Sequence, residues 1–453
     1  MLKKVCVWAM LLSFVPSLFG QSIDSNLLLK NVDIISLKKN HAKTNYLNEV
    51  FTANSLQNQW SELYVKNYGL GQLSTLSVRG MSAENTTILW EGIPINSAMN
   101  GVFDLNSIPN SMLQNFSYQI DNNRLTTGGN FNLNQPKSRE NYLIFSSTAY
   151  LSSLFSQKLE GNINFKHANL SFVNQFTSGS NNFSYQNELN EIKKLDNNSV
   201  RQINSQVFFN YYLKNNWEIN SGVWYFNQHR HIPISEYYNP SEQHLDDKNY
   251  RMFVGIKNKD LDIKLSYHNE NEAYEDNTFP AFPYNSEHKI QSYKGVIHYT
   301  KKLNTNWGMK YMLNPSHYII ESTSFADKKT ISEAIQQINF NYAPTEKLLF
   351  EAGLKSQINT NFSNFILPFI STTYSINSKF STSLIADMNQ RTPTANELYY
   401  NPVGNTLLKP ENNYQIRNVW KYISKNFYDN IQLNVEPYFL YSRDNIKWLP
   451  TAV

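Results

Sequence analysis

Apolar and polar residues alternate with a period of two over most of the chain after about residue 140. Along residues 202–213 apolar side chains alternate mainly with amides, and the pattern resumes at 217–225 after the turn at Lys214–Asn216. A third run covers residues 431–441. This alternation predicts β-strands with one apolar and one polar face. Many runs reach the length, about 9–11 residues, at which a tilted strand crosses a bilayer.

Strands of a soluble β-sandwich also alternate between apolar and polar residues. The lengths of the links between the runs distinguish a sandwich from a membrane barrel. Short turns at 214–216 and 426–430 contrast with long polar links at 178–198, 228–248 and 270–287. Short turns on one side and long loops on the other are typical of a transmembrane β-barrel. The fold class expected is mainly β, with an antiparallel barrel whose apolar faces contact lipid.

The N-terminus has the form of an export signal over residues 1–20. Lys3 and Lys4 precede the apolar stretch Val5–Phe19, and the mature chain is expected to start at Gln21. The alternative is an N-terminal membrane helix, for which the apolar stretch is short. Cleavage would remove Cys6, the only cysteine, and leave a mature chain without thiol chemistry.

Composition supports a membrane barrel and argues against nucleic acid as a partner. Among 453 residues there are 27 Phe, 29 Tyr and 8 Trp, beside a mean hydropathy of −0.50. Barrels display such aromatic residues in girdles at the lipid interfaces. Without Lys3 and Lys4 the charge is nearly balanced, because 40 basic and 36 acidic residues occur in the whole sequence. Nucleic-acid binding needs a basic excess.

The most specific segment is 76–109, where two strand-like runs, Thr75–Val78 and Thr86–Trp90, are each followed by a glycine. It resembles the plug domain of TonB-dependent outer-membrane receptors, with Glu91 in place of the usual Asp. The residues at the motif positions are Ser77, Arg79, Gly80, Glu91, Gly92, Asn96 and Pro109. The resemblance implies an α+β plug at residues 46–137 inside a barrel at 138–453.

Further plug features are expected on either side of this segment. Ser55 can cap a helix whose apolar face contains Leu56, Trp60, Leu63 and Tyr64. The family's usual Arg-Gly-Pro is replaced by residues 121–124, which puts a second plug arginine in doubt. The resemblance gives Arg79 the role of locking the plug to barrel carboxylates, and Glu436, on the polar side of its run, is one candidate partner.

Residues 21–45 are polar and expected to be flexible around one β-prone run. In the receptor family such a run is the TonB box, to which the periplasmic energiser adds a strand. The assignment here is Val32, Asp33, Ile34 and Ile35. An ordinary first plug strand is the alternative.

A second match to the family lies late in the chain and resembles an extracellular barrel-loop motif. Its residues are Arg391, Pro393, Glu397, Leu398, Tyr399, Gly404, Asn405, Pro410 and Glu411. About fifteen strand candidates follow residue 140, whereas the family closes a 22-stranded barrel, and the last residue is Val453 rather than an aromatic. The expectation is a C-terminally truncated receptor that does not function alone, because open strand edges in lipid are costly.

Candidate chemistry is sparse. No P-loop, His-Glu-x-x-His or Gly-x-Ser-x-Gly occurs, so no enzyme is predicted and no catalytic residue is assigned. His229 and His231 have the spacing of a metal pair, but a wet loop pair is favoured and no metal is assigned. An acidic loop could bind calcium or be merely solvated; its members are His268, Glu270, Glu272, Glu275 and Asp276. Aromatics in the long links could contact a ligand or belong to a girdle: Tyr237, Tyr238, Tyr274 and Tyr400.

The resemblance implies an outer-membrane receptor of a Gram-negative bacterium that imports a scarce, bulky ligand such as a cobalamin or ferric siderophore. Its partners would be the TonB complex, the ligand at the cell surface and outer-membrane lipid. Alternatives are a passive porin-like or adhesin barrel, and a non-functional truncated receptor.

Overall fold

The computed structural model describes residues 62–113, 116–119, 125–135, 138–150, 153–187, 189–233, 242–425 and 430–448. The predicted export signal, the segment Val32–Ile35, Tyr237 and Tyr238 lie outside these residues, as do residues 121–124 and 426–429. Within the described part, no helix is long and apolar enough to cross a membrane.

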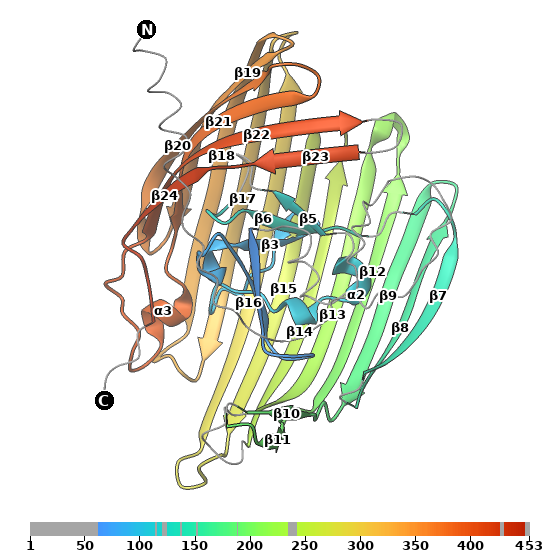
Figure 1. The fold of residues 1–453 in the computed structure, drawn as a ribbon, viewed down its shortest axis with the longest axis vertical. Helices are drawn as coiled ribbons and strands as arrows, with labels where there is room; N and C mark the ends of the chain where they lie inside the picture. Colours follow the sequence, from blue (N-terminus) through green and yellow to red (C-terminus); the bar gives the residue numbers. More distant parts are fainter. Residues whose placement is uncertain are drawn as a thin grey trace. The chain divides into compact units, whose positions relative to one another are not determined.

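Most of the described chain forms one antiparallel sheet of sixteen strands, here called the large sheet. Successive strands are neighbours with two exceptions: β12 pairs with β9 across the small hairpin of β10 (Ser184–Gln186) and β11 (Ile192–Lys194), and β24 pairs with β22. The members are β7 (Tyr142–Tyr150), β8 (Leu154–Asn164), β9 (Ala168–Gly179), β12 (Val200–Tyr212), β13 (Glu218–Ile232), β14 (Gln243–Lys257), β15 (Leu261–Asp276), β16 (Tyr284–Lys302), β17 (Trp307–Ser322), β18 (Lys329–Thr345), β19 (Leu348–Asn359), β20 (Phe362–Ser375), β21 (Phe380–Arg391), β22 (Glu411–Lys425), β23 (Asn430–Val435) and β24 (Tyr438–Arg443). The sheet confirms the predicted fold class (Figure 1).

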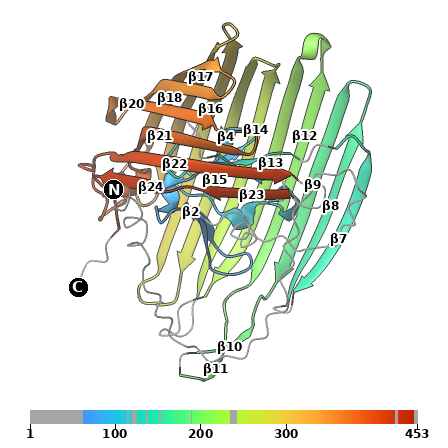
Figure 2. The ribbon, with the colours of Figure 1, turned by 45° about the horizontal axis from the view of Figure 1, so that its top comes forward.

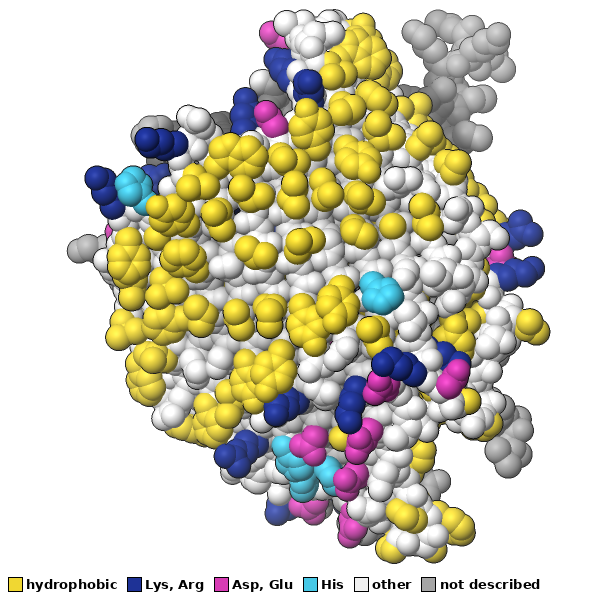
Figure 3. All heavy atoms as spheres, turned by 180° about the vertical axis from the view of Figure 1, so that it is seen from behind, with side chains coloured by type: hydrophobic (Ala, Val, Ile, Leu, Met, Phe, Trp, Pro, Cys, Tyr) yellow, Lys and Arg dark blue, Asp and Glu magenta, His cyan; other side chains and the backbone are white. Residues whose placement is uncertain are grey.

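The alternation along each strand decides which face meets which environment. On β12, Gln202, Asn204 and Gln206 are buried, whereas Val207 and Phe209 are 45% and 41% exposed. The predicted assignment of amides to one face and apolar side chains to the other is therefore confirmed for this strand. Figure 3 shows the result on the outer face: a broad band of hydrophobic side chains, bordered on one side by a group of charged and histidine side chains.

Three links for which the sequence predicts long loops contain strand residues, and two of them are mostly strand. β13 and β14 reduce the link at 228–248 to residues 233–242, and β15 and β16 reduce the link at 270–287 to residues 277–283. In the link at 178–198, β10 (Ser184–Gln186) and β11 (Ile192–Lys194) pair as a hairpin. The polar ends of β13 to β16 do not alternate between apolar and polar residues, because both of their faces carry polar residues. Their backbones nevertheless continue the hydrogen-bonded pairing of the large sheet.

The alternation along 431–441 predicts one strand, but the structure has two strands there. The run divides into β23 and β24, which pair with different halves of β22, and Glu436 and Pro437 form the break. Proline cannot donate to a ladder, which explains why pairing stops there. Figure 2 shows β22 beside β23 and β24 at one edge of the large sheet, with β7 at the other.

The plug region, residues 62–135, consists of two small sheets and short helices. β1 (Leu63–Asn67) and β2 (Ser74–Val78) form a hairpin. A second sheet has the order β4 (Ile93–Pro94), β3 (Thr87–Trp90), β6 (Asn130–Leu133) and β5 (Phe116–Gln119). The helices are η2 (Ala83–Asn85), η3 (Leu105–Ser107) and α2 (Asn110–Leu113).

The predicted helix that included Leu63 and Tyr64 is wrong at these two residues, which begin β1. Leu63 and Val65 are buried, whereas Tyr64 and Lys66 are exposed. The spacing of positions 56, 60, 63 and 64 fits a helix, whereas the alternating burial along 63–66 fits a strand, and pairing with β2 shows the strand. The two strands predicted for 75–78 and 86–90 are confirmed to within one residue as β2 and β3.

An apolar core joins the plug region to the large sheet. Trp90, fully buried on β3, packs against Phe208, Trp224 and Phe253 of three neighbouring strands, with ring centroids 5.9, 5.6 and 5.0 Å away. On the opposite side the plug region bonds to β22 and Glu436. The plug region therefore lies on the concave side of the large sheet, as the blue strands in Figures 1 and 2 show.

Candidate ligand site and plug contacts

Two tight turns in the plug region explain part of the motif. Arg79 and Glu91 each have φ of 52°, and Gly80 and Gly92 follow with φ of 73° and 86°. Two consecutive left-handed residues favour glycine at the second position. The Glu91 carboxylate accepts a short hydrogen bond from the backbone N–H of Gln135, so the unusual glutamate still bonds within the plug region.

The apex of the plug region is the loop from Ile95 to Gly101, and Asn96 shapes it. Its side chain accepts from the Ile88 amide (2.7 Å) and donates to the carbonyl oxygens of Thr86 (2.9 Å) and Gly101 (2.8 Å). These bonds satisfy three backbone groups that belong to no ladder. Two other motif residues have local roles: the Ser77 hydroxyl lies 3.4 Å from the Tyr64 carbonyl, and Pro109 accepts from the Met112 amide (2.9 Å).

Arg79 reaches the large sheet through Glu436, the partner named from the sequence. The guanidinium donates to the Glu436 carboxylate at 2.7 Å, lies 3.6 Å from Glu62 and stacks 4.7 Å from the Tyr438 ring centroid. Arg417 of β22 bonds the same Glu436 oxygen at 3.2 Å. A plug arginine and a sheet arginine therefore share one carboxylate.

The late loop motif is organised by Arg391 at the end of β21. Its guanidinium bonds both oxygens of Glu397 (3.0 and 3.1 Å) and both oxygens of Glu411 (2.9 and 3.1 Å). Glu397 belongs to α3 (Ala395–Tyr399), where it forms a capping box with Thr394. Glu411 also accepts from Asn85 of the plug region at 3.1 Å. One arginine thus joins the loop helix to a carboxylate that holds the plug region.

The first amides of α3 bond directly to the plug apex. The Ala395 and Asn396 amides donate to the carbonyl oxygens of Ala98 (3.3 Å) and Met99 (2.9 Å). The first amides of a helix have no partner within the helix. The apex loop supplies those partners, so α3 covers it.

The remaining motif residues support this arrangement. Leu398 is buried, and the Tyr399 hydroxyl accepts from Asn361 at 3.1 Å. The Asn405 amide donates to the Glu397 carbonyl at 2.8 Å. A Cβ at Gly404 would lie 2.5 Å from the Tyr400 nitrogen, so no larger residue fits there. Pro393 lines a cavity beside the apex, and Pro410 is buried before β22.

Two of the aromatic residues predicted for a ligand site lie in one cluster at the loop end, defined here by the connections 180–199, 233–242 and 392–410. The Tyr400 hydroxyl bonds that of Tyr284 at 2.7 Å, and the Tyr284 and Tyr274 ring centroids are 6.0 Å apart. Trp448 contacts Tyr400 edge-on at 6.5 Å. The hydrogen bond to Tyr284, with partial burial, raises the pKa of Tyr400 to about 12.

Charged residues of the plug region and the large sheet form ion pairs beside the apex that no sequence motif predicts. Asp104 of the plug region pairs with Arg230 at 2.7 Å, and Arg251 pairs with Glu270 at 3.2 Å while stacking on Phe103 and Trp224. Arg230, Arg251 and Glu270 occupy inward positions of β13, β14 and β15, respectively. The available signal was a charge at an inward position of an alternating strand, because a charge facing the core needs a partner.

The residues named as a calcium loop lie on strand β15 instead. His268 and Glu270 are buried on the inner face, whereas Glu275 lies on the outer face and pairs with His244 at 3.3 Å. These side chains therefore do not converge on one point. Among the described residues, no group of three or more His, Cys, Asp or Glu could hold a metal ion.

His229 and His231 also lie on a strand, β13, rather than in the predicted wet loop. Their rings are 5.2 Å apart, and His229 bonds Asp246 at 2.7 Å on the outer face. They face away from the plug region.

Buried lysines of the large sheet hold the plug backbone. Lys264 donates to the Glu91 carbonyl (2.7 Å), Lys294 to the Pro94 carbonyl (2.8 Å) and Lys355 lies 3.4 Å from the Leu125 carbonyl. Each is at most 6% exposed. A lysine that bonds a backbone carbonyl depends on the path of the backbone and not on the side chain at that position. Two of the three bonds, to Glu91 and Pro94, are made at the β3–β4 turn.

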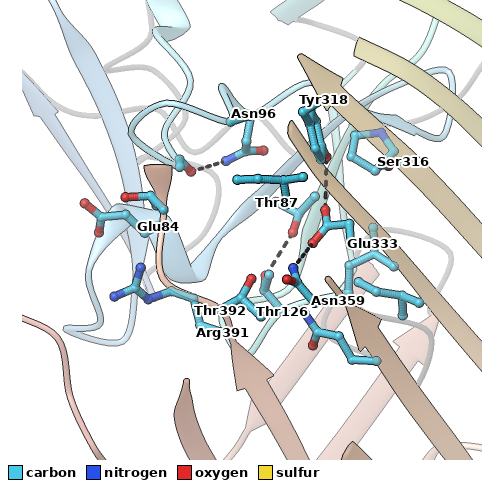
Figure 4. Close-up of a pocket in the computed structure, with 18 of the residues that line it drawn as sticks. Glu84, Thr87, Asn96, Thr126, Ser316, Tyr318, Glu333, Asn359, Arg391 and Thr392 are labelled. Atoms are coloured by element: carbon cyan, nitrogen blue, oxygen red, sulfur yellow. Dashed lines mark hydrogen bonds between the residues drawn. The ribbon is translucent and has the colours of Figure 1, made fainter. Parts of the chain in front are cut away.

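Among the cavities between the plug region and the large sheet, two lie next to β17 and β18. One, of about 620 Å³, is lined by amides and by Lys264, Lys310 and His298. The other, of about 170 Å³, lies between the apex loop and β17–β19, with Thr392–Ala395 at its border (Figure 4). The second cavity is the candidate ligand site, because it lies at the apex and beside the loop helix.

Comparison with known proteins agrees with this architecture. Residues 48–131 match the model of the TonB-dependent receptor plug domain. A comparison with curated proteins finds no match. The solved structures that resemble the chain are transporters and receptors rather than enzymes.

Three solved structures illustrate the resemblance. The copper transporter OprC matches with a TM-score of 0.66 and 11% identity, over 87% of this chain and 69% of its own length. The FrpB iron transporter from Neisseria meningitidis matches with a TM-score of 0.70 and 10% identity, over 87% and 70%. The ferric enterobactin receptor PfeA from Pseudomonas aeruginosa matches with a TM-score of 0.61 and 12% identity, over 80% and 66%. At these identities the likeness shows the fold. The chain therefore contains a region that matches the TonB-dependent receptor plug domain and shares the fold of these transporters and receptors.

Proposed function

We propose that this protein is an outer-membrane receptor of a Gram-negative bacterium that imports a scarce, bulky ligand, such as a ferric siderophore or a cobalamin, with energy supplied by TonB. The observation that carries the proposal is the plug region bound inside the large sheet. A plug that fills the lumen prevents passive flow, so import needs energy to move it. The related structures named above include iron and copper transporters and a ferric enterobactin receptor.

The outer face supports the membrane location. Exposed apolar residues recur on the outward positions of successive strands, as Val223, Val254 and Leu265 show at 52%, 54% and 64% exposure. Tyrosines lie toward the loop end on the same face, where the Tyr225–Tyr250 and Tyr267–Tyr293 centroids are 5.0 and 5.3 Å apart. An apolar band bordered by aromatic rings is what a bilayer requires of a strand wall.

The alternative is a passive porin-like or adhesin barrel. The bonds from Arg79, Asn85 and Asp104 to the wall argue against it, since a passive pore has no use for a fixed plug. The mechanism favoured here is that ligand contacts at the apex and the loop helix shift the plug between two arrangements, and the energiser then pulls on the N-terminal segment.

The test is transport in a Gram-negative host that lacks its own siderophore and cobalamin receptors. Cells that express the gene, with any coding sequence that continues in frame beyond residue 453, should accumulate radiolabelled ligand from a panel of ferric siderophores and cobalamin. Accumulation should disappear when TonB is deleted. Equal accumulation with and without TonB would favour the passive barrel, and recovery of the protein outside the outer-membrane fraction would overturn the location.

A further inference from the structure

We propose that the cavity beside the plug apex binds a cationic alkylammonium group of the imported ligand. The inference rests on the proposed function and names the chemistry of one subsite within it. The cavity has a volume of about 170 Å³, well above the roughly 10–15 Å³ that one water needs. It is too small for a whole siderophore or cobalamin and suits a side arm.

The polar groups of the cavity are mainly acceptors. Glu333 of β18 points into it, where its carboxylate accepts from the Tyr318 hydroxyl (3.0 Å) and from the Asn359 amide (3.4 Å), as Figure 4 shows. Within the described residues, Glu333 makes no ion pair. A carboxylate at a largely closed surface without a cation is an unfavourable arrangement that a cationic ligand would relieve.

Two further amide side chains line the same cavity, one of which, Asn314, also lines the larger cavity. Asn314 and Gln357 are 5% and 6% exposed and line the cavity, and the Oδ1 atom of Asn314 and the Oε1 atom of Gln357 accept no hydrogen bond. Buried amide oxygens are normally satisfied. Together with Glu333 they offer three acceptors to a group that carries several N–H donors, and an ammonium has three.

The cations near the cavity are already engaged. Arg391 lines it, but its guanidinium bonds Glu397 and Glu411. Lys294 lies 5.4 Å from the Tyr318 ring centroid, and its ammonium donates to the Pro94 carbonyl. Glu84 of the plug region adds a second carboxylate to the lining. Lys294 is close enough to offset part of the Glu333 charge, but the second carboxylate leaves the lining net negative, which favours a cation over a carboxylate or phosphate arm.

An ammonium bound there would contact both the apex loop and the loop helix α3. The lining includes Asn96, Ser97 and Ala98 of the apex loop and Thr394 and Ala395 of the loop helix. The bond from the Ala395 amide to Ala98 lies at the same border. Ligand binding in this cavity would therefore alter the contacts between the loop helix and the plug region.

The experiment uses purified protein in detergent and butylammonium as the probe, with neutral N-butylacetamide as its matched control. Binding is followed by ligand-observed NMR at pH 7. Butylammonium should bind and N-butylacetamide should not. Glu333→Gln, which keeps the shape of the side chain, should weaken butylammonium binding by at least about tenfold, the loss expected for a hydrogen bond to a charged group. Glu321→Gln removes an exposed carboxylate that pairs with Lys328 and should leave binding unchanged.

Equal binding of the two probes, no binding of butylammonium, or undiminished binding to Glu333→Gln would overturn the proposal. Glu84→Gln gives a second variant, with a smaller loss expected, if Glu333→Gln alters the fold as judged by heat-modifiable gel mobility. The assay needs no TonB and no uptake. A protein that binds butylammonium but imports nothing would contradict the proposed function and leave the ammonium site standing.

Discussion

The guanidinium of Arg79, in the turn after a plug strand, lies 2.7 Å from the carboxylate of Glu436, 357 residues later in the chain. Arg79 is 3% exposed and Glu436 is 18% exposed. Glu436 stands at the break between β23 and β24, and Arg417 bonds the same carboxylate oxygen. The plug region is thus tied to the last strands of the described sheet by one shared carboxylate.

Replacement of Arg79 by Ala should loosen the plug region. Removal of one partner of a buried ion pair costs about 3–5 kcal/mol, because the other charge stays buried and unpaired. We expect faster protease cleavage within residues 62–135 and higher leakage of small solutes through the reconstituted protein. Arg139→Ala, at an exposed position, is the control. Leakage and cleavage equal to those of the parent would reject the locking role of Arg79.

Replacement of Arg391 by Lys should release the loop helix. A lysine keeps the charge but cannot form two bidentate bonds, so each charged hydrogen bond to Glu397 or Glu411 that is not replaced would cost about 1.5–3 kcal/mol. We expect faster hydrogen exchange at the Asn396 and Asn405 amides, which bond Met99 and Glu397. Lys409→Ala, in the exposed part of the same loop, should not change exchange. Unchanged exchange in Arg391→Lys would show that the arginine network does not hold α3.

Replacement of Lys264 by Met should weaken the grip on the β3–β4 turn. The apolar stem remains, but the Glu91 carbonyl and the Asp262 carboxylate at 3.0 Å lose their donor. Such losses cost about 1–3 kcal/mol each. Limited proteolysis should cut near Gly92 sooner than in the parent. Lys66→Met, an exposed plug lysine, serves as the comparison. If both variants are cleaved at the parent rate, the lysine does not restrain this turn.

Replacement of Ile34 by Pro tests the TonB box at Val32–Ile35, which lies outside the described residues. Proline removes a backbone donor from any added strand. Uptake should be lost while ligand binding to whole cells at the surface stays at the parent level. Ile23→Pro, upstream of the segment, is the control and should transport normally. Normal transport by Ile34→Pro would reject the assignment.

The sequence alone determined the strand faces and the plug turns, because these depend on neighbours in the chain. The pleat repeats every two residues, so the amides and apolar residues of 202–211 divided correctly between the two faces. The turns at Gly80 and Gly92 follow from local backbone angles that glycine permits.

Tertiary structure decided what local pattern could not. Leu63 and Tyr64 fit a helix or a strand until β2 paired with them. The sequence pattern predicts loops for the segments 243–248 and 270–276, because polar residues on both faces hide the strand period. The ladder between β14 and β15 shows that both segments are strands. Arg79 could be given a list of carboxylates but not a single partner, because side chains distant in sequence meet only where the whole sheet brings them together. The cavity at Glu333 exists for the same reason: its walls come from the plug region, three strands and a loop.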